Sequence, residues 1–261
     1  MWVIGLMYFS VILIANALGA ISGMGGGVLI KPIFDLIGQD PVASISFYSA
    51  VAVFTMSIVT TFKQIRNGIN IRWNFVGWIA GGSIIGGVFG NNLLAKLLSI
   101  LPSEKQVLLT QIVVTILTIV FAFMNTKFAW KSWNLKGWYW QLGCGLTLGM
   151  FASFLGIGGG PINVALLMLM FGIPIKEATV YSICTILFSQ GAKLLSIITI
   201  TGFTGINLQR LWFIIPAAIL GGLLGSQMSR ILYTKYVEIV FQGMLVLVIL
   251  INFYNGLMIF V

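Results

Sequence analysis

The sequence predicts an all-α polytopic integral membrane protein composed of two inverted repeats. Of its 261 residues, 59% are hydrophobic and only 7% are charged, whereas a soluble domain carries roughly 25% charged residues. Apolar runs of membrane-spanning length recur along the chain, and one glycine-rich motif occurs twice, once in each half. We therefore expect eight full transmembrane helices and two short half-helices that start at the glycine motifs, which makes ten elements.

The predicted full-length helices follow from apolar runs of roughly 20 residues, the length that crosses a bilayer. They cover residues 2–20, 43–62, 73–95, 106–124, 138–155, 178–200, 211–231 and 237–260. Two shorter runs, 24–38 and 158–172, would reach only about 22 Å as helices. Because the linkers are brief, no soluble domain is expected. The first run ends in small residues like a signal peptide but lacks a positive leading region, so we expect it to be retained.

Three sequence blocks occur once in each half of the chain and in the same order. They are 23–27 with 156–160, 68–70 with 205–207, and 86–90 with 221–225, so the three blocks repeat at nearly one offset. This duplication predicts an N-terminal membrane repeat of residues 1–125 and a C-terminal membrane repeat of residues 134–261. The basic segment 126–133 is expected to join them as a cytoplasmic linker.

The distribution of lysine and arginine predicts that the repeats are inverted. If ten elements alternate across the membrane, nine basic residues fall on one side and three on the other, with Lys31 and Lys193 left inside the membrane. The nine are Lys63, Arg66, Arg72, Lys127, Lys131, Lys136, Lys176, Arg230 and Lys235, and the three are Lys96, Lys105 and Arg210. The positive-inside rule places the larger group in the cytoplasm and both termini outside it. The net charge of +9 forms no basic face, so no nucleic acid is expected.

The paired glycine motifs are the first candidate binding site. The glycines that lead into the short runs are Gly25, Gly26, Gly27, Gly158, Gly159 and Gly160. Glycine permits a turn whose N–H groups are not covered by side chains, and the N-terminus of the following helix carries about half a positive charge. In inverted repeats the two turns would converge near the midplane on one anion. The alternative is close helix packing, which is also the role expected for the clusters 81–90 and 221–225.

Three ionisable residues are predicted inside apolar runs, where their cost makes them functional candidates. Lys31 and Asp35 are one helical turn apart and can neutralise each other on one helical face; Asp35 is also the candidate for binding a coupling ion. Lys193 has no acidic residue one helical turn away. We expect it to bind an anion, with snorkelling to the interface as the alternative. Asn163 and Gln190 could donate neutral hydrogen bonds to the same anion, or could join helices.

The residue inventory excludes several chemistries. The chain has no histidine, which excludes histidine–zinc catalysis, serine–histidine catalysis and histidine-ligated haem. Cys144 and Cys184 lie in apolar stretches and are expected to be small core residues rather than a disulfide or metal pair. The five carboxylates lie mostly near predicted helix ends and outline no interior path for a cation. We expect no enzyme activity, no cofactor and no metal site.

The motif Gly23–Gly27 followed by Pro32, its recurrence at Gly156–Gly160, and the later GGxxG blocks resemble the TauE/SafE family of membrane proteins. The resemblance covers nearly the whole chain, although Pro32 has Ala165 at the matching position. The family is described as sulfite exporters and organosulfonate transporters. The resemblance implies transport of a small sulfur-containing anion, such as sulfite or sulfoacetate, across a bacterial or archaeal plasma membrane.

The residues and the resemblance together lead us to expect a secondary transporter for a small anion that works by alternating access. Two alternatives remain: an anion channel whose filter is formed by the glycine turns, and a non-transporting membrane subunit in assembly or biogenesis. The expected partners are the anionic substrate and the lipid bilayer. A coupling proton or sodium ion and a homo-oligomer are left open.

Overall fold

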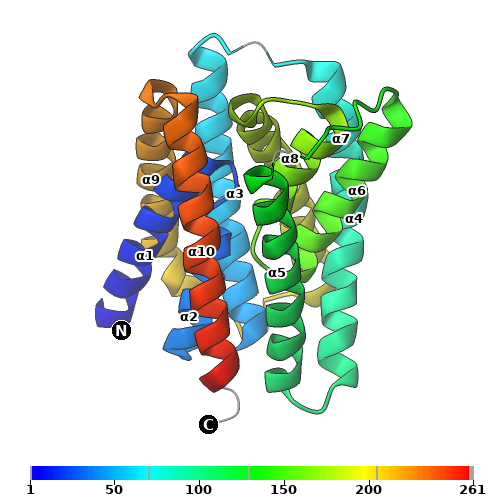
Figure 1. The fold of residues 1–261 in the computed structure, drawn as a ribbon. Coiled ribbons are helices and arrows are strands. Elements are labelled where there is room, and N and C mark those ends of the chain that lie inside the picture. Colours follow the sequence, from blue (N-terminus) through cyan, green and yellow to red (C-terminus); the bar gives the residue numbers. More distant parts are fainter. Residues whose placement is uncertain (1, 70, 129, 204, 259–261) are drawn as a thin grey trace.

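The computed structural model describes residues 2–69, 71–128, 130–203 and 205–258. Within this part the chain forms ten α-helices and no β-strand (Figure 1). In chain order the helices are α1 (Trp2–Ser22), α2 (Gly27–Ile37), α3 (Val42–Arg66), α4 (Trp73–Ile100), α5 (Glu104–Lys127), α6 (Trp138–Phe154), α7 (Pro161–Phe171), α8 (Ile175–Ser196), α9 (Leu211–Ile231) and α10 (Thr234–Met258). A π-helical turn, η1 (Ile197–Thr201), extends α8, and a 3-10 turn, η2 (Leu208–Arg210), precedes α9. The prediction of an all-helical protein is confirmed.

In the described part of the chain, seven helices are long and apolar enough to cross a membrane. They are α1, α3, α4, α5, α8, α9 and α10. The sequence predicted eight; the remaining one, α6, has 17 residues, a length of about 26 Å. Large apolar side chains point outward from the spanning helices, such as Leu117 on α5 and Trp212 on α9, which are 64% and 82% exposed. This surface suits lipid, and the chain is a multi-pass membrane protein.

The two short apolar runs form α2 and α7, helices of 11 residues each and about 16 Å in length. Both helices end at a glycine in the left-handed conformation, Gly38 (φ 64°) and Gly172 (φ 66°). Pro161 is the first residue of α7, where its missing N–H costs nothing. Each helix begins one turn later than the apolar run, because the glycine motifs form turns with positive φ at Gly25 and Gly158.

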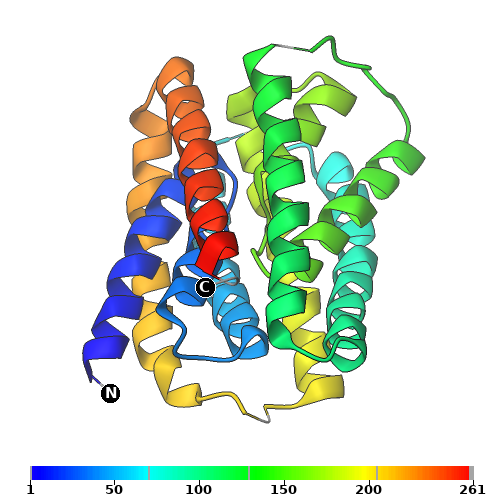
Figure 2. The ribbon, with the colours of Figure 1, turned by 60° about the horizontal axis from the view of Figure 1, so that its bottom comes forward.

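Helices from the two halves of the chain pack against each other throughout the bundle. α1 packs along α9 and α4 packs along α6, while α3 and α8 contact each other. α5 contacts α10, and each of them lies beside the short helix of the other half, α7 and α2 respectively. In a second view, α1, α9 and α10 form one side of the bundle and α4, α5 and α6 form the other (Figure 2).

The N-terminal end of α1 and the C-terminal end of α10 lie on the same side of the molecule (Figure 1). We call this the termini end. The loops and helix ends at the opposite end carry the nine basic residues that the sequence places on one side, and we call it the basic end. The described structure therefore divides the basic residues between its two ends in the way that ten alternating elements require.

Small residues allow the long helices to approach closely. A Cβ on Gly86 of α4 would overlap the carbonyl oxygen of Leu146 in α6, and one on Gly225 of α9 would overlap that of Ala17 in α1. Such contacts hold membrane helices together by close backbone packing. The packing role predicted for these two clusters is confirmed at both positions, whereas Gly81 faces open space.

Candidate functional site

The two glycine motifs form turns that touch each other in the interior. The position of a Cβ on Gly159 lies 3.2 Å from the carbonyl oxygen of Met24, and a Cβ on Gly27 would overlap the carbonyl oxygen of Ile157. Gly26 is the N-cap residue of α2. This contact joins the two halves of the chain. It is formed by backbone atoms, and it requires glycine because a side chain at these positions would not fit.

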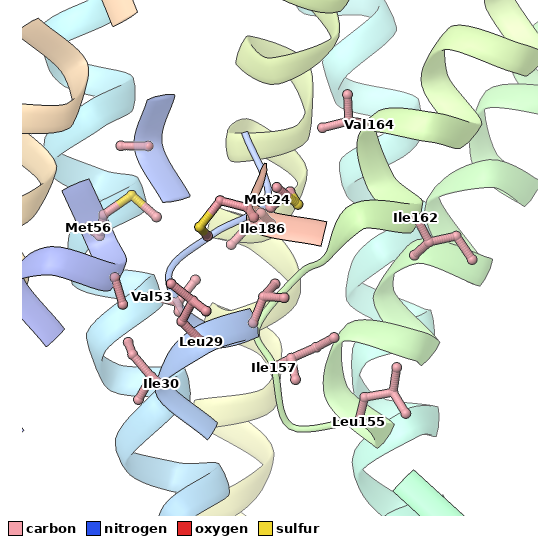
Figure 3. Close-up of a cluster of buried hydrophobic side chains, with 14 of the residues drawn as sticks. Met24, Leu29, Ile30, Val53, Met56, Leu155, Ile157, Ile162, Val164 and Ile186 are labelled. Atoms are coloured by element: carbon pink, nitrogen blue, oxygen red, sulfur yellow. The ribbon is translucent and has the colours of Figure 1, made fainter. Parts of the chain in front are cut away.

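Apolar side chains pack against Gly25 and Gly158 in the two turns, whereas polar side chains approach other glycines of the motifs. Val53 on α3 lies 3.2 Å from the Cβ position of Gly25 and 3.0 Å from that of Gly158. Ile186 on α8 lies 3.3 Å from the Cβ position of Gly25. Figure 3 shows these two side chains and Met24 gathered around the turns. These two glycines thus meet an apolar cluster, and the charged groups lie beside it.

Lys193 supplies a cation that is enclosed by protein. Its side chain is fully buried, and Nζ donates hydrogen bonds to Oγ of Ser46 at 2.6 Å and to the carbonyl oxygen of Ser153 at 3.3 Å. In the described part of the chain it forms no ion pair with a carboxylate. The alternative of snorkelling is wrong, because the ammonium group lies inside the bundle instead of reaching its surface.

Lys31 approaches the same region from α2. It is 3% exposed and forms an ion pair with Asp35, 2.7 Å from Nζ to Oδ2. Its Cε lies 3.2 Å from the Cβ position of Gly156, which is itself 2.7 Å from Oγ of Ser46, the partner of Lys193. The two lysines therefore converge on Ser46. One carboxylate thus meets two lysines, and Lys193 is the lysine that has no carboxylate partner among the described residues.

Two further predicted site residues, Gln190 and Asn163, are buried and have side-chain amides without partners among the described residues. Gln190 lies on the same face of α8 as Ile186 and Lys193, because residues three and four apart on a helix are neighbours. Its side-chain amide forms no hydrogen bond with the described residues, and neither does that of Asn163 in the first turn of α7. Both side chains are at most 1% exposed. Buried polar atoms are normally paired, so these amides have unused capacity for a ligand or water. Gly160 is the N-cap residue of α7.

Two asparagines that sequence reasoning missed hold the short helices in place. Nδ2 of Asn255 on α10 donates to the carbonyl oxygen of Pro32 on α2 at 2.7 Å. Nδ2 of Asn125 on α5 donates to the carbonyl oxygen of Ala165 on α7 at 2.9 Å. Pro32 and Ala165 occupy matching positions of the two glycine-led segments. The sequence repeat shows that Pro32 matches Ala165, but it does not indicate which asparagines donate hydrogen bonds to them.

Ser46 and Ser153 were also missed. The sequence shows no signal for either residue, because each is a small polar residue in an apolar run. Ser46 binds Lys193 from 147 positions away. Oγ of Ser153 is buried and has no partner among the described residues, so it adds a further unused hydroxyl beside Lys193.

A multi-pass helical bundle that encloses a charged polar centre is typical of membrane transporters. The chain matches the family model described as "Sulfite exporter TauE/SafE" over residues 8–251, and it belongs to this family. It is similar to "Probable membrane transporter protein YunE" of Bacillus subtilis (strain 168), with 24% identity over 255 residues that cover 90% of this chain and 92% of the relative. No solved structure matches the chain. The family confirms the resemblance and supports a role in membrane transport.

Proposed function

We propose that the chain is a secondary transporter that moves a small anion, a sulfur oxyanion or organosulfonate such as sulfite or sulfoacetate, across the plasma membrane. The observation that carries the proposal is the buried ammonium group of Lys193, which has no carboxylate partner in the described structure and lies beside unpaired polar groups. A buried cation is costly in a membrane, and a bound anion would offset that cost. The family description supports a sulfur oxyanion.

The anion in this proposal contacts Lys193 first, with Ser46, Ser153 and Gln190 as neutral donors. Lys31 adds positive potential, although Asp35 compensates most of it. The glycine turns and the N-termini of α2 and α7 contribute through their backbone dipoles. Asn163, in the first turn of α7, is a further neutral donor in this proposal.

The proposed mechanism is alternating access between two inverted repeats. Each half supplies five α-helices to the described structure. The packing of α1 on α9 matches that of α6 on α4, and the hydrogen bonds to Pro32 and Ala165 repeat at equivalent positions. These equivalences support a pseudo-two-fold arrangement in which one repeat moves against the other.

The proposed orientation places the basic end in the cytoplasm and both termini outside it, as the positive-inside rule requires. A negative-inside potential favours the exit of an anion by about 2.3 kcal/mol per charge per 100 mV, so export needs no coupling ion. Uptake would need a proton or sodium ion. Asp35 is the candidate to bind it, but its ion pair with Lys31 favours a structural role and hence export.

The apolar cluster around the glycine turns supports a carrier rather than an anion channel. A channel filter would keep a continuous polar path through the turns, whereas Val53 and Ile186 pack against them. Movement between two states would be needed to let an anion pass. A carrier therefore predicts slow, saturable flux with counterflow.

The experiment is a sulfite counterflow assay with the purified protein in liposomes, using the wild type and Lys193→Met. Methionine is an unbranched side chain one heavy atom shorter than lysine, and it removes the charge. Loss of a charged hydrogen bond of about 1.5–3 kcal/mol should weaken sulfite affinity about 10- to 150-fold. The matched control is Lys235→Met, which removes an exposed lysine from the basic end and should leave affinity unchanged. Equal affinity in the wild type and Lys193→Met would refute the site, and absence of flux in the wild type would refute transport.

A further inference from the structure

The two ends of the molecule carry matching contacts between a tyrosine and an arginine. Tyr48 near the start of α3 and Tyr181 near the start of α8 occupy equivalent positions in the two halves. The guanidinium carbon of Arg210 lies 5.9 Å from the ring centroid of Tyr48, and that of Arg72 lies 5.6 Å from the ring centroid of Tyr181. Each contact joins a tyrosine from one half of the chain to an arginine from the other half.

At the termini end, Asp40 adds a carboxylate to this contact. Its Oδ2 accepts a hydrogen bond from the hydroxyl of Tyr8 at 2.6 Å and forms an ion pair with Arg210. The guanidinium carbon of Arg210 also lies 4.9 Å from the ring centroid of Tyr8. We call Tyr8, Asp40, Tyr48 and Arg210 the Asp40 cluster. The side chains of Asp40 and Arg210 are only 9% and 18% exposed, so water screens their attraction incompletely.

The Asp40 cluster is reinforced by main-chain contacts between the same two halves. The hydroxyl of Tyr48 accepts a hydrogen bond from the backbone N–H of Asn207 at 3.0 Å and donates one to its carbonyl oxygen at 3.1 Å. The hydroxyl of Ser44 donates to the carbonyl oxygen of Gly205 at 3.2 Å. The start of α3 is thus fixed to the loop before α9.

At the basic end, the position that matches Asp40 is Ile173. The alignment is fixed by Pro41 and Pro174, which follow these residues and precede α3 and α8. Arg72 donates from Nε to the hydroxyl of Tyr181 at 3.1 Å, but it forms no ion pair among the described residues. The basic end has the tyrosine–arginine contact without an ion-paired carboxylate, because Glu177, which lines the cavity beside Tyr181, forms no ion pair with Arg72 in the described structure.

The cavities at the two ends also differ in size, and the larger one lies at the basic end. A cavity of about 300 Å³ at the basic end lies between α3, α8 and α9. Its lining includes Gln64, Lys176, Tyr181 and Arg230. At the termini end, the cavity beside Arg210 measures about 60 Å³. The structure is therefore hollow beside Tyr181 and nearly filled beside the Asp40 cluster.

We propose that the Asp40 cluster is a latch that closes the termini end, and that an isoleucine at position 173 leaves the basic end free to open. This inference rests on the proposed alternating access. The ion pair exists only while the start of α3 contacts the loop before α9, so it stabilises one conformation over the other, as a shift in populations requires. Asp40 and Arg210 would then set the resting state without contacting the anion.

The test measures which end of the protein admits a membrane-impermeant thiol reagent. The reporter is Ser49→Cys on α3, at a fully buried position, in a chain whose buried Cys144 and Cys184 are replaced by alanine. The reagent is added to either face of oriented vesicles, and the ratio of the two modification rates is recorded. Asp40→Asn keeps the size of the side chain and an acceptor for Tyr8. It should raise the ratio of termini-end to basic-end rates about tenfold, since a charged hydrogen bond contributes about 1.5 kcal/mol or more.

Three further variants make the test decisive. Arg210→Gln should raise the ratio as Asp40→Asn does, and it carries the test if the latter does not fold. Ile173→Asp gives Arg72 a carboxylate partner and should also raise the ratio, because it stabilises closure of the basic end. Glu104→Gln is the matched control: its carboxylate accepts the N–H of Val42 at the termini end, outside the cluster, and the ratio should not change.

An unchanged ratio in both Asp40→Asn and Arg210→Gln would overturn the latch, and so would a ratio that falls. The reporter reaction needs no bound anion. Failure of the latch would therefore leave sulfite binding at Lys193 intact, whereas failure of the proposed anion site would appear in counterflow and not in thiol accessibility.

Discussion

The contact between the two glycine turns predicts that Gly27→Ala destabilises the protein. A Cβ at this position would overlap the carbonyl oxygen of Ile157 and lie 2.8 Å from Oγ of Ser49. Because the overlap involves backbone, a side-chain rotation cannot relieve it and the turns must separate. Overpacking of this kind costs about 1–3 kcal/mol, while alanine in place of glycine gains up to about 1 kcal/mol in a helix. We expect a net destabilisation of about 1–2 kcal/mol.

The assay is thermal unfolding of the purified protein in detergent, together with sulfite counterflow. Gly77→Ala on α4 is the matched control, since a Cβ there meets no atom within 4 Å and should be neutral or stabilising. Gly27→Ala should lower the unfolding temperature and reduce flux, because separated turns displace the starts of both short helices. If Gly27→Ala unfolds at the same temperature as Gly77→Ala and keeps full flux, the turns do not touch and the expected clash is refuted.

Three other substitutions test the charge pair and the anchoring of the short helices. Asp35→Asn leaves the buried Lys31 without its carboxylate and should destabilise by about 3–5 kcal/mol, with partial recovery in the double variant Lys31→Met/Asp35→Asn; an unfolding temperature equal to that of the wild type would contradict the pair. Asn255→Leu removes the hydrogen bond to Pro32 and should cost about 0.6–1.7 kcal/mol, the range for such bonds in membranes. Asn125→Leu should cost a similar amount, and no loss in either variant would show that the asparagines do not hold the short helices.

Much of the fold was predictable because hydropathy and glycine content act locally. The glycine motifs marked both short helices, and Pro161 fitted the first position of α7. The helix boundaries were less accurate: α4 continues to Ile100, five residues beyond its predicted end, and α8 begins at Ile175, three residues before its predicted start. Neither feature has a periodic signal in an apolar run.

The candidate site was predictable only in its charged members. Lys31 and Lys193 stand out because a cation in an apolar run is rare. Ser46 and Ser153 become informative only when packing brings them to Lys193 across 147 and 40 positions. The Asp40 cluster was missed for the same reason, since Asp40 and Arg210 are 170 positions apart and each lies near a helix end, where charge is common.

The most direct test of the proposed site is to locate the bound anion. Crystals of the protein grown with selenite, a heavier analogue of sulfite, would reveal the selenium atom by its anomalous scattering. We expect a peak within about 4 Å of Nζ of Lys193, as a hydrogen bond between ammonium and an oxyanion requires. The peak should disappear in Lys193→Met. A peak only in the cavity beside Arg230, or none at a selenite concentration that saturates transport, would contradict the claim that the buried lysine holds the substrate.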